Sequence, residues 1–146
     1  RAPGRVAVAQ LVEAQGEGVT MRGRTVRLEH VDEGVRVTDL KTGKSGHSAK
    51  TVPDNPQLAA YQMALLASGA QVAGARIALL GGDKPKTFDQ KPLEGKTLEE
   101  WRSKVREVAA IARGPYFEAT PSEDACRYCS FDRLCPARER GRKVVE

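Results

Sequence analysis

The chain has 146 residues, of which 40% are hydrophobic, and no apolar stretch approaches the ~20 residues that span a bilayer. Composition therefore predicts one globular domain and no membrane partner. The net charge of +5 and the pI near 9.3 are compatible with a polyanionic partner, although an ordinary basic surface would give the same values. Because the chain begins with Arg1 and has no signal-peptide pattern, we expect an internal piece of a longer protein.

The first forty residues predict three consecutive antiparallel strands. Alternation of apolar and polar residues predicts strands over Arg5–Val12, Val19–His30 and Val35–Lys41. Two glycines place a turn over Glu13–Gly18, and Asp32–Gly34 predicts a hairpin turn. The first half of the chain is therefore expected to be a meander.

A capped helix is predicted over Pro56–Ser68. Asp54 or Asn55 can cap it, proline suits the first helical position, and Gly69 ends it. Its expected buried positions are Leu58, Met63, Leu65 and Leu66.

The next apolar run, Ala73–Leu80, predicts a buried strand. Since it follows a helix, we expect it to pair in parallel with Val35–Lys41. Thr87–Gln90 could form a short edge strand. The fold class is thus α/β, a mixed sheet with helices against it.

A second helix is predicted from a capping box in which Thr97 is followed three residues later by Glu100. It should run to about Arg113, where Gly114 and a proline stop it. Its expected apolar stripe is Trp101, Val105, Val108 and Ile111.

Four polar side chains are predicted to converge between the Val35–Lys41 strand and the first helix. Asp39 and Lys41 share one strand face, because side chains alternate. Gln57 and Tyr61 lie four residues apart and therefore share one helix face. A carboxylate, an ammonium, an amide and a phenol so placed can act on one phosphate, whereas the simpler interpretation is a surface ion pair beside a core-edge aromatic.

The segments DLKTGK and NPQLAAYQMAL resemble the RecB-type branch of the PD-(D/E)XK nucleases, in which a strand ending D-x-K-T-G precedes a helix with Q-x-x-x-Y. The resemblance implies a restriction-endonuclease-like mixed sheet, with a nuclease core over 1–120 and a cysteine segment over 121–146. It also implies a cytoplasmic DNA-repair helicase–nuclease, with a fainter similarity to actinobacterial subunits. The expected partners are DNA and a helicase domain or subunit.

The chemistry implied by the resemblance is Mg²⁺- or Mn²⁺-dependent hydrolysis of DNA phosphodiesters. Asp39 would be a metal ligand, and Lys41 would stabilise developing negative charge or orient the attacking water. Gln57 and Tyr61 would support the site. Arg24, Arg27 and Lys44 are predicted to contact the DNA backbone.

One position departs from the family pattern. The family usually has G-x-[IVA]-D-R on the preceding strand, and the matching stretch places Val26 where the second metal-binding acid belongs. Glu29 is predicted to face the other way, while Glu13 and Asp54 are possible substitutes. The alternative function is therefore an inactive nuclease-like domain that binds DNA or docks a subunit.

The C-terminal segment carries Cys126, Cys129 and Cys135 in the spacing C-x2-C-x5-C-P. An odd number of cysteines argues against a disulfide framework and favours a metal or cluster site. The resemblance implies a 4Fe–4S cluster whose fourth ligand lies outside this chain. Zinc with His47 or His30 as the fourth ligand, and free thiols, remain the alternatives.

Overall fold

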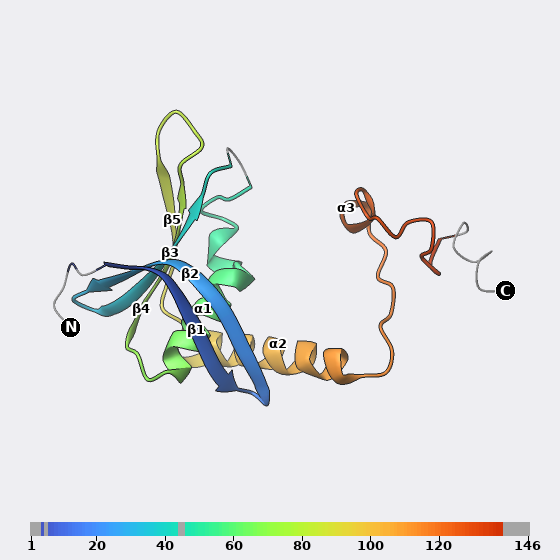
Figure 1. Cartoon of the computed structure of the whole chain (residues 1–146), viewed down its shortest axis with the longest axis horizontal. Coiled ribbons are helices and arrows are strands. Elements are labelled where there is room, and N and C mark those ends of the chain that lie inside the picture. The colour runs from blue at the N-terminus through green and yellow to red at the C-terminus, as the bar shows by residue number, and fades with distance from the viewer. Residues whose placement is uncertain (1–3, 5, 44–45, 139–146) are drawn as a thin grey trace. The chain divides into compact units, whose positions relative to one another are not determined.

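The computed structural model describes residues 4, 6–43 and 46–138, apart from the side chains of residues 9, 10, 12, 14 and 26. The chain divides into two compact units, Arg1–Ala109 and Ala110–Glu146. The first contains one sheet with the strand order β1-β2-β3-β4-β5 (Figure 1). This mixed α/β architecture confirms the predicted fold class.

The meander is confirmed, with β1 (Val6–Gly16), β2 (Val19–Val31) and β3 (Gly34–Lys41) paired antiparallel. The first predicted turn was wrong in extent, because β1 continues to Gly16. Only Glu17 and Gly18 join β1 to β2, and both have positive φ, 53° and 72°. Paired positive φ angles match the right-handed twist of a hairpin, so a two-residue turn suffices.

Helix α1 (Pro56–Ala67) covers one face of the sheet and follows a short 3₁₀ turn, η1 (Val52–Asp54). Asn55 is the cap, since its side chain accepts a hydrogen bond from Leu58 N–H at 3.0 Å. Three of the four predicted buried positions are buried, and Leu66 is half-buried. The main core comprises Val37, Val52, Leu58, Ala64, Leu65, Val72, Ala75, Ile77 and Leu79.

The second half of the sheet has the predicted polarity. Strand β4 (Val72–Leu79) pairs in parallel with β3, and β5 (Lys86–Gln90) pairs antiparallel with β4 at the edge. The carboxyl ends of β3 and β4 therefore lie at one end of the sheet, where the loops that follow them project together (Figure 1).

Helix α2 (Gly95–Arg113) begins two residues before the predicted cap. Leu98 N–H donates to the Glu94 carbonyl at 3.2 Å, so Thr97 already lies inside the helix and the capping-box prediction was wrong. Charge also anchors this helix, because Arg102 and Arg106 both form ion pairs with Glu17 at the β1–β2 turn.

The predicted apolar stripe of α2 is half-buried over its first two residues and exposed over its last two. Trp101 and Val105 pack against a second cluster of Ala59, Met63 and Leu93. Val108 and Ile111 are 65% and 53% exposed. Amphipathic periodicity shows which face of a helix is apolar, but how far that face is covered depends on where α1 and the sheet end.

Besides the last turn of α2, the second unit contains one short helix among the described residues, α3 (Glu123–Cys126). The Ser122 hydroxyl caps it by accepting a hydrogen bond from Ala125 N–H at 3.1 Å. The first two cysteines of the C-terminal motif thus lie at the end of this turn and just beyond it.

Candidate functional site

Asp39 is the buried acid of the candidate site. It lies on β3 with 4% of its surface exposed, and its Oδ2 is 2.8 Å from Lys41 Nζ. Oδ2 is buried and, apart from this ion pair, has no hydrogen-bond partner in the part of the chain that the structure describes. A buried carboxylate oxygen in this state retains acceptor capacity that a cation or a proton donor can use.

Lys41 connects the strand to α1 through a run of polar contacts. Its Nζ donates to Gln57 Oε1 at 3.2 Å, and Gln57 Nε2 donates to the Tyr61 hydroxyl at 3.1 Å. The Tyr61 hydroxyl in turn donates to the Arg24 carbonyl on β2, also at 3.1 Å. The structure therefore brings together the four side chains that the sequence placed on one strand face and one helix face.

Gly23 makes this arrangement possible, which sequence reasoning missed. A β-carbon at position 23 would lie 2.9 Å from Cε1 of the Tyr61 ring. The absence of a side chain lets the ring rest against β2 while its hydroxyl reaches the neighbouring carbonyl.

The N-terminus of α1 is held by Gln90, a second residue that the sequence did not single out. Gln90 is 3% exposed, and its Nε2 lies within hydrogen-bonding distance of the carbonyls of Val52, Pro53 and Asn55, at 3.4, 2.9 and 3.1 Å. Its Oε1 accepts from Gln62 Nε2 at 2.9 Å. Gln90 thereby ties β5 to the turn that orients Gln57.

We expect Tyr61→Phe to lower the free energy of unfolding by about 0.5–1.5 kcal/mol, because the Arg24 carbonyl and the Gln57 amide lose a partner. Denaturant unfolding measures the change. Tyr116→Phe, at a residue that is 75% exposed, is the control and should leave stability unchanged. Equal stability of Tyr61→Phe and the wild type would contradict the hydroxyl's role as an anchor.

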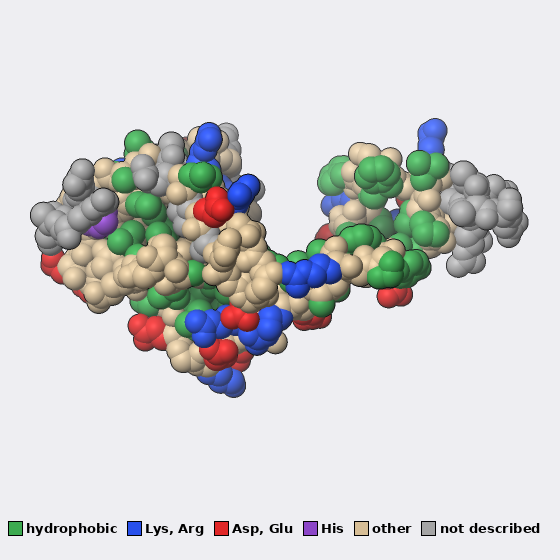
Figure 2. Space-filling model, turned by 60° about the horizontal axis from the view of Figure 1, so that its bottom comes forward, with side chains coloured by type: hydrophobic (Ala, Val, Ile, Leu, Met, Phe, Trp, Pro, Cys, Tyr) green, Lys and Arg blue, Asp and Glu red, His purple; other side chains and the backbone are tan. Residues whose placement is uncertain are grey.

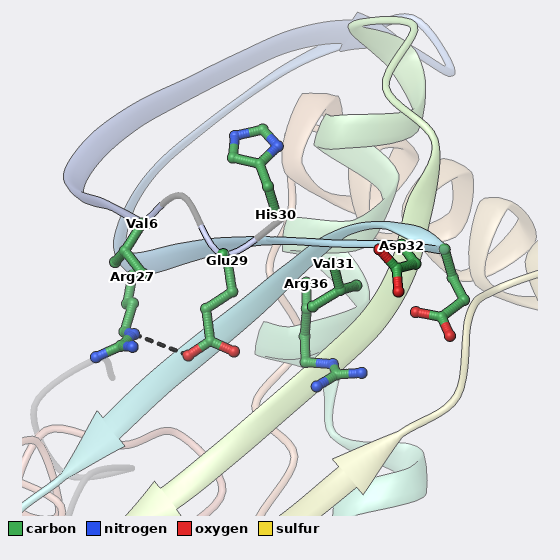
Figure 3. Close-up of a pocket in the computed structure, with 9 residues that line it drawn as sticks. Val6, Arg27, Glu29, His30, Val31, Asp32 and Arg36 are labelled. Atoms are coloured by element: carbon green, nitrogen blue, oxygen red, sulfur yellow. Dashed lines mark ion pairs between the residues drawn. The ribbon is translucent and has the colours of Figure 1, made fainter. Parts of the chain in front are cut away.

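The three predicted DNA-contacting residues have different placements. Arg24 is exposed beside the site, and Lys44 lies outside the described residues. Arg27 forms an ion pair with Glu29, with Nε 2.8 Å from the carboxylate (Figure 3). Arg27 pairs with Thr38 of β3, and Thr38 projects from the sheet face opposite to that of Asp39. Arg27 therefore lies away from the candidate site, although its contact with DNA stays a prediction.

This opposite face of the sheet carries several charges in a compact arrangement. Arg27, Glu29 and Arg36 line a hollow there (Figure 3), which confirms the expectation that Glu29 faces away from Asp39. Next to them, Arg76 forms a bidentate pair with Asp89 at 2.6 and 3.0 Å. The hydrogen bond from Arg76 holds the pKa of Asp89 below its usual value. Acidic and basic side chains also alternate over the face shown in Figure 2, so the visible surface is not a single basic patch.

The described side chains fit a metal site with one carboxylate. Mg²⁺ is often held by one or two carboxylates, with water and phosphate completing its shell. Asp39 supplies one such group, but residues 4, 6–43 and 46–138 contain no cluster of three His, Cys, Asp or Glu side chains suited to a metal. Glu13 is engaged by Arg22 at 3.0 Å, and Asp54 is exposed on η1. The Val26 side chain is not among those described.

The three cysteines are free thiols in the second unit. Cys129 is exposed, whereas Cys126 and Cys135 are half-buried. The hydrogen bond with Cys126 raises the pKa of Arg138 above its ordinary value. Because the described residues show no group of three metal ligands, the geometry does not support the expected iron–sulfur cluster or the zinc alternative.

A mixed sheet that presents an acid-x-lysine strand end to a Gln and a Tyr on the following helix defines a nuclease-type fold. The model of the PD-(D/E)XK nuclease superfamily matches residues 2–136, and the chain belongs to this superfamily. Nucleases of this superfamily typically use divalent metal ions.

Among solved structures, 15 chains match. The crystal structure of SSO0001 aligns over 91% of this chain with a TM-score of 0.55 and 19% sequence identity, which supports the fold alone. This chain spans 61% of the length of that protein. A search of curated proteins found no match. No helix in the described part of the chain is long and apolar enough to cross a bilayer.

Proposed function

We propose that this domain is a divalent-metal-dependent nuclease that hydrolyses DNA phosphodiester bonds. The observation that carries the proposal is the state of Asp39. Its Oδ2 is buried, pairs with the Lys41 ammonium at the end of β3, and has no further hydrogen-bond partner among the described residues. The Lys41 ion pair offsets part of the cost of burying this carboxylate, and a bound cation would use the acceptor capacity that remains.

Each residue would have a distinct role in this site. Asp39 would hold the metal ion, which when bound polarises the phosphate and activates water. Lys41 neutralises the carboxylate in the free domain and can stabilise negative charge that develops on a phosphate. Gln57 restrains the Lys41 ammonium, and Tyr61 fixes Gln57 against β2. The acid and the lysine are thereby oriented before a substrate arrives.

The alternative is a nuclease-like domain that binds DNA or a protein partner without cleaving it. Val26 favours this alternative, because an isopropyl group offers no oxygen to a metal at the position where the superfamily usually has an acid. The two functions share the fold and differ in metal affinity and turnover.

The deciding experiment titrates the domain with Mn²⁺ by calorimetry and then measures cleavage of end-labelled DNA. The nuclease proposal expects saturable Mn²⁺ binding and metal-dependent cleavage, both lost in Asp39→Asn. Asp89→Asn is the matched control, since it makes the same chemical change on the opposite sheet face and should retain both. Saturable DNA binding without Mn²⁺ binding or cleavage would instead establish the inactive alternative.

We also propose a process, a partner and a cellular location for this domain. The DLKTGK and QLAAY segments support a RecB-like role in DNA repair, with a helicase domain or subunit as partner and a cytoplasmic location. From the C-x2-C-x5-C-P spacing alone, we also propose a metal or iron–sulfur site that needs a ligand from another segment. Iron and zinc analysis of the anaerobically purified protein distinguishes a cluster, a zinc site and free thiols.

A further inference from the structure

A hollow of about 580 Å³ lies at the carboxyl end of β4, next to the candidate active site. It is formed where the chain leaves β4 and turns back into β5. Its lining residues are Leu79, Gly81, Gly82, Asp83, Lys84 and Lys86. The loop between these strands projects from the same end of the sheet as the segment that follows β3 (Figure 1).

Strand register places Lys86 on the same face as the candidate catalytic residues. Lys41 pairs with Leu79 across β3 and β4, and Leu79 pairs with Lys86 across β4 and β5. Directly paired residues project from the same face of a sheet, so Lys86 shares the face of Lys41 and Asp39. With neighbouring strands about 4.8 Å apart, the backbones of Lys41 and Lys86 are separated by roughly 10 Å.

The loop is held tightly against the end of β3. Leu80 N–H donates to the Lys41 carbonyl at 2.8 Å, extending the pairing beyond the last ladder residue. A β-carbon at position 81 would lie 2.0 Å from the Thr42 carbonyl oxygen, so only glycine allows this approach. The position of the hollow beside Lys41 is therefore built into the backbone.

Lys84 and Lys86 bring two positive charges to this hollow. Both are exposed, and neither forms an ion pair with another described residue. Asp83 supplies the opposing charge at the rim, leaving an excess of one positive charge among the lining residues. Solvation alone would also leave two lysines exposed and unpaired. It does not account for the position of Lys86, which lies in register with Lys41 across β3, β4 and β5.

We propose that this hollow binds a backbone phosphate of the nucleic acid, next to the phosphate that Lys41 and a metal ion on Asp39 would position. The inference rests on the proposed DNA-binding function and extends it to a second contact. Lys86 and Lys84 would neutralise the flanking phosphate and guide the strand along the row from Lys41 towards β5. As contacts to phosphate, they contribute affinity and register but not base specificity.

The test measures DNA affinity as a function of salt, in chelator so that no cleavage occurs. The Lys84→Gln/Lys86→Gln variant is compared with Lys91→Gln/Lys96→Gln, which removes one lysine just beyond the far end of β5 and one at the start of α2. Loss of two phosphate contacts should reduce the slope of log K against log salt by about 1.4 for single strands or 1.8 for duplex. The control variant should keep the wild-type slope.

A second variant tests the hollow without removing a lysine. Asp83→Asn removes the opposing carboxylate and should tighten DNA binding at low salt, with the effect disappearing as salt is raised. If the wild type binds DNA while the lysine variant matches the control in slope and Asp83→Asn changes nothing, the second phosphate site is wrong and the proposed function survives. If the wild type neither binds nor cleaves DNA, both proposals fail.

Discussion

Replacing Val26 with aspartate is expected to tighten Mn²⁺ binding by at least about 10-fold, because the change supplies a second carboxylate where the superfamily usually has one. Even outer-shell partners of a metal site change its affinity by about 10–100-fold. DNA cleavage should rise with it, since the metal would be retained at concentrations where the wild-type site is largely empty. Position 26 lies within β2, three residues before Glu29, which is directed to the opposite face. The Val26→Asp variant therefore restores an acid that no described neighbour replaces.

The matched control is Val26→Asn, which has the size and polarity of aspartate without its charge. The gain should be absent from this variant, and Val26→Asp combined with Asp39→Asn should lose it. Calorimetry with Mn²⁺ and cleavage of end-labelled DNA give the two readouts, and denaturant unfolding confirms that the variants are folded. Unchanged metal binding in a folded Val26→Asp protein would show that the candidate site is misplaced.

Replacing Gln90 with leucine should strongly lower stability and disturb the orientation of the site residues on α1. The change removes the amide that reaches the carbonyls of Val52, Pro53 and Asn55, together with the acceptor for Gln62. Stranded buried polar groups cost about 1–3 kcal/mol each, so we expect unfolding stability to fall by about 2–4 kcal/mol. Because Asn55 caps α1, the first turn that carries Gln57 should also lose its orientation.

Val72→Ala serves as the control for stability alone. Val72 is a core residue at the start of β4, whereas Lys41 pairs with Leu79 at the end of that strand. Truncating Val72 should lower the free energy of unfolding by a similar amount through lost packing. At a temperature where both variants are folded, Gln90→Leu should weaken Mn²⁺-dependent cleavage through kcat, and Val72→Ala should not. Equal kcat values in the two variants would reduce Gln90 to a structural role.

Local patterns were sufficient for most of the first unit. Alternation in β2 and β3, the Asn55–Pro56 start of α1 and the parallel return of β4 all agree with the structure. These features depend on nearby residues, since side-chain alternation, capping and turn geometry are short-range. One error arose at Thr97, where a capping-box pattern lies inside a helix that had already begun. Another arose in the α2 stripe, whose coverage depends on packing against distant residues rather than on local pattern.

The same division applies to the candidate site. That Asp39 and Lys41 share a face, and that Gln57 and Tyr61 share another, follows from strand and helix periods and was determined by sequence alone. Only the tertiary structure decided that Gln57 contacts Lys41 and that the Tyr61 ring packs against Gly23. It also decided that Gln90 donates hydrogen bonds to the turn that precedes α1. The alignment of Lys86 with Lys41 and the position of Arg27 on the far face were likewise decided by tertiary structure. Each depends on the register between elements distant in the chain, and that register is set by packing of the whole core rather than by local preference.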